Sequence, residues 1–275
     1  MAGEERPVRQ KQGGRRLMVE ANQPAGRSHE SGQAGRFRWM AEGLTRAMQT
    51  HDPGASPIFH EVVAYADPGG RVLDVGAGVG RFAVPLARAG RDVIAVEPAP
   101  VMCERLRRHV AEAAVEERVR VVEGAWPAVD VPPVDVALGA FVLQFAEDPV
   151  AFVRAMEQVA RRRVVLALHV DPLPMAELRR LLGDEAPRSA PLFADLYPRL
   201  EAAGIRPRVQ FMEDDHVPPL TDEGSVERFL AHMGLDGDPE RVRRVKAFVA
   251  ERVADGSWTR PRRSALLSWT PGEGD

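Results

Sequence analysis

Short apolar runs alternate with helical segments between residues 71 and 213, and this alternation constrains the fold more than any other feature of the chain. Most runs are rich in valine, isoleucine or leucine, and the segments between them carry apolar residues at helical spacing. Strands that alternate with helices in this way pair in parallel, with the helices on both faces of the sheet. We therefore predict an α/β fold with a doubly wound sheet. The predicted strands are 71–76, 92–97, 119–124, 134–141, 163–169 and 208–213.

The chain before the first strand divides into two parts. Residues 1–35 have few large apolar side chains, so they cannot bury enough surface to offset the entropy of ordering, and we predict a disordered tail. Residues 36–66 carry two predicted helices. The second begins at Ser56-Pro57, an N-cap residue followed by proline in the first turn. The apolar stripe of the first helix consists of Phe37, Met40, Ala41, Leu44 and Met48.

The alternation changes near residue 215. Two amphipathic helices are predicted within 216–258, and a last strand follows at 263–269. We expect residues 67–275 to form one domain that carries 216–258 as a helical insertion. The insertion and the helices of 36–66 are predicted to lie over the carboxyl ends of the strands as a lid on the substrate.

Composition excludes several classes of protein. With 44% hydrophobic and 28% charged residues among 275, the chain is not wholly disordered. No apolar run approaches the roughly 20 residues of a transmembrane helix, and the first 30 residues show no secretory signal. The single cysteine, Cys103, rules out an internal disulfide and a cysteine-rich zinc site, and we expect a cytoplasmic protein. A net charge of −3 gives no support to nucleic-acid binding.

A glycine-rich turn follows the first predicted strand. Gly76-x-Gly78-x-Gly80 stands between that strand and the helix predicted over 80–89. Glycines allow a tight turn and close approach to a ligand, and a helix N-terminus offers unpaired N–H groups. Glu97 ends the next strand, 21 positions after Gly76, where an acidic side chain can bind both hydroxyls of a ribose. The pattern predicts a site for an adenosine-type ligand.

Two residues near this turn indicate which ligand. A dinucleotide fingerprint requires a third glycine where Arg81 stands, and helix–strand packing there leaves no room for a large side chain. Asp74, two residues before the first glycine, is poorly placed for a pyrophosphate and well placed for an ammonium group. S-adenosylmethionine has a ribose, an adenine and an amino acid end without phosphate, so it fits both observations.

Three segments resemble motifs of the class I S-adenosylmethionine-dependent methyltransferases. They are LDVGAGVG (73–80), VIAVEP (93–98) and PVDVALGAFVLQF (133–145). The resemblance implies a seven-stranded, mostly parallel sheet with an antiparallel C-terminal strand, and S-adenosyl-L-methionine as cofactor. The cofactor residues it implies are Asp74, Gly76, Ala77, Gly78, Gly80, Glu97 and Pro98, with backbone near Gly139, Ala140 and Phe141.

The adenine side departs from the family pattern. The family often has G-D-A after the third strand, with the aspartate on the adenine amine, whereas this chain has Gly124-Ala125-Trp126. Adenine recognition then rests on backbone groups, and Trp126 is either a platform for the ring or a core aromatic. Met102 lies on the buried stripe of the next helix and is predicted to serve both the core and the adenine pocket.

The histidines offer a candidate base. His169 ends the fifth predicted strand, at the edge where ligands bind in open α/β sheets, and could remove a proton from the acceptor; a capping or solvated histidine is the alternative. His60 and His216 are further candidates near the predicted lid. No histidine spacing is typical of a metal site, so no metal is expected. Arg161–Arg163 is predicted to be a cluster at a helix C-terminus.

The expected reaction is direct methyl transfer to a small, partly apolar organic acceptor, with neither nucleic acid nor membrane as partner. The apolar stripes of the predicted lid favour such an acceptor. An RNA or protein methyltransferase, a binding protein without catalysis and a nucleotide-dependent oxidoreductase are the alternatives. The acidic net charge opposes RNA, and Arg81 opposes the oxidoreductase.

Overall fold

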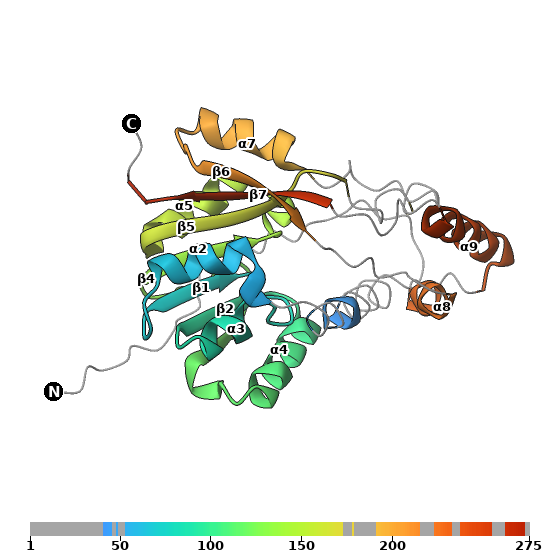
Figure 1. Ribbon diagram of the computed structural model, residues 1–275, viewed down its shortest axis with the longest axis horizontal. Coiled ribbons are helices and arrows are strands. Elements are labelled where there is room, and N and C mark those ends of the chain that lie inside the picture. The colour runs from blue at the N-terminus through green and yellow to red at the C-terminus, as the bar shows by residue number, and fades with distance from the viewer. Residues whose placement is uncertain are drawn as a thin grey trace.

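A single sheet of seven strands forms the centre of the molecule (Figure 1). The computed structural model describes residues 41–45, 48, 53–172, 178, 191–214, 223–232, 237–254 and 262–272. The strand order is β3-β2-β1-β4-β5-β7-β6. The strands are β1 (Arg71–Val75), β2 (Asp92–Glu97), β3 (Val119–Glu123), β4 (Val134–Ala140), β5 (Ala160–His169), β6 (Arg208–Asp214) and β7 (Arg262–Trp269).

The first five strands in the chain run parallel to one another. β1 pairs with β2 and β4, β2 pairs with β3, and β4 pairs with β5, all in parallel. β7 is inserted between β5 and β6 and runs antiparallel to both. The predicted doubly wound, mostly parallel sheet with an antiparallel C-terminal strand is therefore confirmed.

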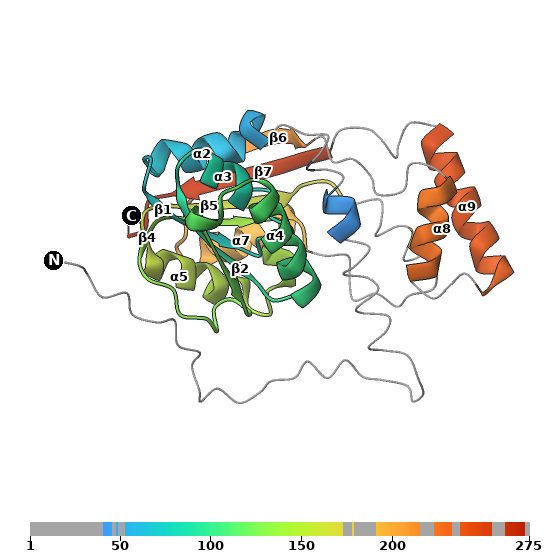
Figure 2. The same ribbon diagram turned by 90° about the horizontal axis from the view of Figure 1, so that it is seen from below.

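Helices cover both faces of this sheet (Figures 1 and 2). α2, α3 and α4 share one core with the sheet, and α5 and α7 share the other. In β4, Val136 and Leu138 belong to the first core and Ala137 to the second, which is the two-residue period of a strand buried on both faces. The helices are α2 (Pro57–Tyr65), α3 (Ala83–Arg88), α4 (Pro100–Glu112), α5 (Pro149–Val159), α7 (Phe193–Ala202), α8 (Glu223–His232) and α9 (Pro239–Ala254), with short turns η1 (Pro53–Ala55), η2 (Glu116–Arg118) and η3 (Leu143–Phe145).

The prediction for Arg161–Arg163 was wrong, because these residues lie in β5 and not at a helix end. α5 ends at Val159, and β5 begins at the next residue. Arg163 is buried where α2 crosses the sheet, and its guanidinium contacts Glu61 at 2.9 Å and the Ser268 hydroxyl at 3.1 Å. These partners come from distant parts of the chain, so the local pattern of three arginines could not reveal them.

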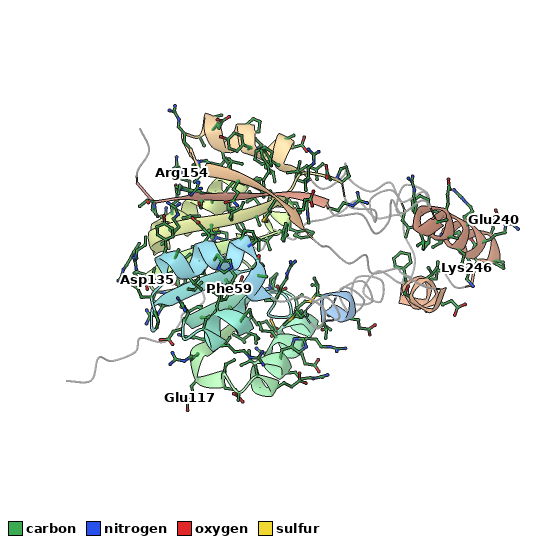
Figure 3. All side chains as sticks on the ribbon, viewed as in Figure 1. Phe59, Glu117, Asp135, Arg154, Glu240 and Lys246 are labelled. Atoms are coloured by element: carbon green, nitrogen blue, oxygen red, sulfur yellow. The ribbon has the colours of Figure 1, made fainter. Side chains whose placement is uncertain are left out.

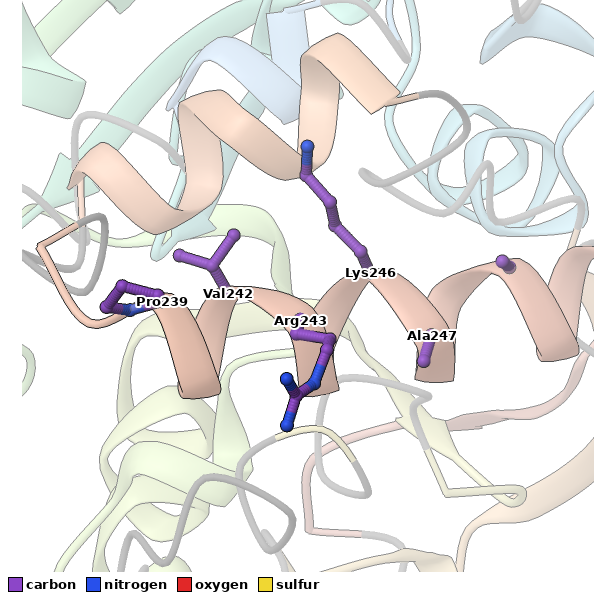
Figure 4. Close-up of a pocket in the computed structure, with 6 residues that line it drawn as sticks. Pro239, Val242, Arg243, Lys246 and Ala247 are labelled. Atoms are coloured by element: carbon purple, nitrogen blue, oxygen red, sulfur yellow. The ribbon is translucent and has the colours of Figure 1, made fainter.

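α8 and α9 form a separate pair of helices (Figures 1 and 2). In both views the pair lies apart from the sheet, on the side of the short helical segment that contains residues 41–45. Lys246 of α9 donates to Glu227 of α8 at 3.0 Å, and Figure 4 shows its side chain directed toward that helix. Two helices were predicted within this insertion, and its role as a lid stays a prediction.

Several sequence predictions lie outside the described residues. These include the disordered tail 1–35, the helix start before residue 41, His216 and the segments that connect the insertion to the sheet. None of the described helices is long and apolar enough to cross a membrane.

Candidate cofactor and acceptor site

The predicted site residues meet at one edge of the sheet. β2 and β3 lie on one side of β1, and β4 and β5 lie on the other, so the direction of winding reverses between β1 and β4. The loops that leave the carboxyl ends of these parallel strands open at this reversal, which is where open α/β sheets bind ligands. The segments after Val75, Glu97, Glu123, Ala140 and His169 all leave the sheet at this edge.

The glycine turn after β1 is held against β2. The backbone N–H groups of Gly76 and Ala77 both donate to Val96 O, at 2.7 and 3.1 Å. Gly76 has φ +69°, and a Cβ built on it would lie 2.4 Å from Val142 Cγ1, so only glycine fits where this turn passes the β4 loop. The turn extends through residue 82, and α3 therefore begins at Ala83 rather than at residue 80 as predicted.

Glu97 fixes the glycine turn from the neighbouring strand. Its Oε2 accepts a hydrogen bond from Gly78 N and its Oε1 accepts one from Ala99 N, both at 2.9 Å. Glu97 is 7% exposed, so the acidic residue predicted to bind the ribose is buried in the ligand-free protein. Burial raises the pKa of Glu97, and the Ala99 and Gly78 N–H groups partly offset this. The carboxylate still has lone pairs for ribose hydroxyls.

Asp74 is buried on the same face of the sheet. It is 2% exposed, and its Oδ2 has no hydrogen-bond partner within the described part of the chain. Burial, with a smaller contribution from the Glu97 carboxylate, raises the pKa of Asp74 to about 7, against the lowering effect of the Ala83 N–H. An unsatisfied buried carboxylate oxygen at a ligand edge is the feature that a ligand ammonium would complete.

The N-terminal helical segment covers the glycine turn. Ala41 packs with Val79, Ala99 and Met102, and Leu44 packs against the same cluster. The nearest atom to a Cβ built on Gly78, beyond its chain neighbours, is Leu44 Cδ1, at 3.8 Å. The described part of this segment therefore lies over the turn after β1 and the start of α4.

The residues predicted to lie on the adenine side differ in burial: some are exposed and others pack in the core. Gly124 N donates to Glu97 O at 3.0 Å, which brings the end of β3 to the site, and Ala125 is exposed. Trp126 Nε1 donates to Phe152 O at 3.1 Å, and the indole packs against the core with α5. These contacts support the core interpretation of Trp126. Met102 is 3% exposed and also packs within the core, whereas Pro98 is exposed at the end of β2.

The loop after β4 places an aromatic side chain at the reversal point. Phe141 adopts φ +58°, its N–H donates to Ala167 O at 2.9 Å, and Gln144 Nε2 donates to its carbonyl at 2.7 Å. The Arg81 guanidinium lies 5.9 Å from the Phe141 ring centre. By contrast, Gly139 faces the α5 side, where an added Cβ would lie 3.1 Å from a leucine of β5. Gly139 is therefore a candidate for ligand contact only through its backbone.

His169 stacks on this phenylalanine. The two ring centres are 4.4 Å apart and the planes meet at 18°. His169 pairs in register with Ser264 of β7, whose buried hydroxyl has no hydrogen-bond partner among the described residues. His60 is exposed on α2, next to Phe59, which Figure 3 labels on that helix. Sequence reasoning missed Ser264 and the aromatic stack, because both depend on pairing between strands distant in the chain.

A pocket lies on the surface of α9 (Figure 4). It contains two basic side chains, no carboxylate and no glycine turn, so it lacks the groups predicted to bind the cofactor. Its lining residues are Pro239, Val242, Arg243, Lys246, Ala247 and Ala250.

Comparison with known proteins points to the same region of the chain. Residues 72–163 match a family model described as a methyltransferase domain. The ubiquinone biosynthesis O-methyltransferase of Xanthomonas campestris pv. campestris (strain B100) is 31% identical over 118 residues, which are 42% of this chain and 48% of that protein. The chain thus spans about half the length of the curated relatives it matches.

Solved structures share the fold over a larger part of the chain. A SAM-dependent methyltransferase from Geobacter sulfurreducens, in complex with S-adenosyl-L-homocysteine, has a TM-score of 0.52 at 19% identity and covers 86% of this chain and 98% of its own. The corresponding complex from Thiobacillus denitrificans has a TM-score of 0.50 at 18% identity, over 83% of this chain and 96% of its own. The architecture described above is therefore that of the proteins to which the sequence motifs are similar.

Proposed function

We propose that this chain, whose residues 72–163 form a class I S-adenosylmethionine-dependent methyltransferase domain, transfers a methyl group from S-adenosylmethionine to a small organic acceptor. The observation that carries the proposal is the combination of the glycine turn with two buried carboxylates, Asp74 and Glu97, at the edge where the winding of the sheet reverses. The two carboxylates accept hydrogen bonds and carry negative charge, so they fit a diol and an amino group and would repel a phosphate.

The residues of the site would bind and orient the cofactor. Glu97 would accept the ribose hydroxyls, the N–H groups of the glycine turn would contact the amino acid end, and Asp74 would face the amino group. When bound, S-adenosylmethionine would supply an electrophilic methyl group for a single displacement by the acceptor, with S-adenosylhomocysteine as the leaving group. The contribution of the protein is then to hold the two reactants in line and exclude water.

The acceptor would lie beside Phe141 and His169. Their stacked rings stand at the ends of β4 and β5, and the exposed Phe145 follows on the same loop, with 73% of its surface accessible. These side chains favour a partly apolar acceptor. His169 could take the proton from a hydroxyl or amine as the methyl group arrives. The absence of a nucleic-acid partner and a cytoplasmic location stay predictions from the sequence.

Two measurements test the proposal. Isothermal titration calorimetry should detect binding of S-adenosylmethionine and of S-adenosylhomocysteine. It should detect no binding of NAD. Incubation of the protein with S-adenosylmethionine and a panel of phenols, amines and carboxylates should then yield a product heavier by one methylene group. Binding of NAD with none of the sulfonium ligand would overturn the cofactor assignment.

Binding of the cofactor without any methyl transfer would favour the alternative of a binding protein without catalysis. Methyl transfer to RNA or to a protein, with none to the small molecules, would contradict the proposed acceptor class. These outcomes concern the reaction and leave the cofactor assignment unchanged.

A further inference from the structure

Asp74 and Glu97 form a pair of buried acids on one face of the sheet. Asp74 pairs in register with Ala95, and Glu97 is two residues farther along the same strand, so both side chains point to the face covered by α2, α3 and α4. Asp74 is 2% exposed and Glu97 is 7% exposed. Two carboxylates are therefore close together, shielded from water.

Neither member of the pair has a cationic partner among the described ion pairs. Arg81 lies over the rings of Phe82 and Phe141, at 5.4 and 5.9 Å. Arg107 is turned outward to Glu123, at 3.7 Å, and His109 uses Nδ1 to contact Val79 O at 2.8 Å. The charged and titratable side chains of α3 and α4, the two helices next to the pair, are Arg88, Cys103, Glu104, Arg105, Arg107, Arg108, His109 and Glu112.

The two acids differ in how their oxygens are satisfied. Both oxygens of Glu97 accept backbone N–H groups, which stabilise its ionised form. Asp74 receives the Ala83 N–H, and its Oδ2 is left without a partner in the described structure. Two buried carboxylates on the same face of a sheet, two residues apart in register, cannot both ionise at low cost. The geometry therefore assigns any shared proton to Asp74, and burial with the Glu97 charge raises the pKa of Asp74 to about 7.

We infer that the Asp74–Glu97 pair holds one proton in the ligand-free protein and exchanges it for the positive charge of the ligand's amino group, so that the pair selects cationic ligands over adenosine ligands that carry phosphate. The inference rests on the proposed function, because it takes the ligand to be S-adenosylmethionine or its demethylated product. The proton leaves Asp74 for the solvent, and the ammonium takes its place beside Oδ2. Charge in the buried site is the same before and after binding.

Proton release on ligand binding distinguishes this exchange from the alternative, in which Asp74 keeps its proton in the complex. Calorimetry of S-adenosylhomocysteine binding in buffers of different ionisation enthalpy measures the number of protons released. We expect about one proton near pH 6, falling toward zero near pH 8, as linkage to a group of pKa about 7 requires. The affinity should rise about tenfold per pH unit below pH 7 and level off above it.

Variants locate the proton. Asp74→Asn keeps the size of the side chain and cannot titrate, so proton release should disappear. Asp135→Asn is the matched control: Asp135 also accepts a backbone N–H, from Arg71 at 2.8 Å, and it lies at the start of β4, at the opposite end of this strand from the candidate site (Figure 3). This control should release the same number of protons as the unmodified chain. If Asp74→Asn does not fold, Glu97→Gln tests the pair from the other side and should also reduce proton release.

Ligand analogues test the selectivity. S-adenosylhomocysteine acetylated on its amino group should bind at least tenfold more weakly than the parent compound, and adenosine 5′-monophosphate more weakly still. Binding of S-adenosylhomocysteine without proton release at any pH, or equal binding of the acetylated compound, would overturn the inference and leave the proposed function intact. Failure of S-adenosylhomocysteine to bind at every pH would instead overturn the proposed function.

Discussion

The Glu97 carboxylate accepts a hydrogen bond from the backbone N–H of Gly78 at 2.9 Å, which ties the end of β2 to the turn after β1. Its second oxygen accepts the Ala99 N–H at the start of α4. One side chain thus fixes two of the segments that border the candidate cofactor site. Its loss should therefore affect the architecture of the site as well as the affinity for a ribose.

Replacement of Glu97 tests this double role. Glu97→Ala removes both hydrogen bonds and the acceptor for the ribose hydroxyls, so the affinity for S-adenosylhomocysteine should fall by about 2–3 kcal/mol. The free energy of unfolding should fall by about 1–3 kcal/mol, because the buried Ala99 N–H and the half-buried Gly78 N–H lose their partner. Titration calorimetry and urea unfolding of the same protein measure both quantities. An unchanged dissociation constant would show that the ribose is held elsewhere.

The buried Asp74 makes the stability of the ligand-free protein depend on pH. The folded state raises the pKa of Asp74 from an ordinary value of 3.8 to about 7, so its protonated form is favoured by folding. This contribution is fully present below about pH 4 and is lost as the pH rises through 7, with a slope of up to about 1.4 kcal/mol per pH unit. The unfolding free energy of the unmodified chain minus that of Asp74→Asn should decline over this window. A difference that does not vary with pH would contradict the assignment of the proton to Asp74.

Much of the fold could be predicted from local patterns. β2 covers the predicted residues 92–97, and the Asp148-Pro149 signal marks the start of α5, where the carboxylate accepts the Val150 and Ala151 N–H groups. These features depend on neighbours in the chain, so the sequence reveals them. The burial of Glu97 and the position of Arg163 in β5 depend on segments distant in sequence.

In the candidate site, too, some features depend on neighbours in the chain and others on segments distant in sequence. The glycine turn and the acidic end of β2 follow from spacing, because their geometry is set by a strand, a turn and a helix in succession. The contact between Leu44 and the glycine turn and the stack of Phe141 on His169 arise from packing and strand order. No local pattern in the sequence encodes these distances.

Gly78 provides a test of close approach to the ligand. Gly78→Ala places a side chain at φ +56°, which costs about 1–2 kcal/mol of stability, and puts a methyl group at the proposed ligand surface. Gly69→Ala is the matched control, since Gly69 has φ +81°, has no neighbour near an added Cβ and lies before β1. Both variants should lose similar stability, and only Gly78→Ala should also lose affinity for S-adenosylhomocysteine. If Gly78→Ala and Gly69→Ala bind S-adenosylhomocysteine with equal affinity, the ligand does not approach this turn.

The role of His169 can be tested with a substitution that keeps an aromatic ring at this position. His169→Phe preserves an aromatic partner for Phe141 and removes the nitrogen atoms, so turnover should fall by about 10²–10⁴-fold if His169 is the general base. His60→Phe, an exposed change on α2, tests the second candidate base in the same assay. Turnover that is unchanged in His169→Phe would assign the residue to packing alone.

The last prediction concerns the α8–α9 pair as a lid. Phe229 of α8 is 2% exposed, and α8 and α9 are tied together by the Lys246–Glu227 contact. If the pair closes over the acceptor while the core holds the cofactor, loosening it should raise the acceptor KM or lower turnover and leave cofactor affinity nearly unchanged. Phe229→Ala loosens the packing, and Lys246→Met removes the exposed ion pair with Glu227, which is worth less than about 1 kcal/mol. We therefore expect a large kinetic effect in the first variant and a small one in the second, with equal dissociation constants for S-adenosylhomocysteine. If Phe229→Ala lowers the melting temperature but alters neither the acceptor KM nor turnover, the helix pair does not contribute to acceptor binding through this residue.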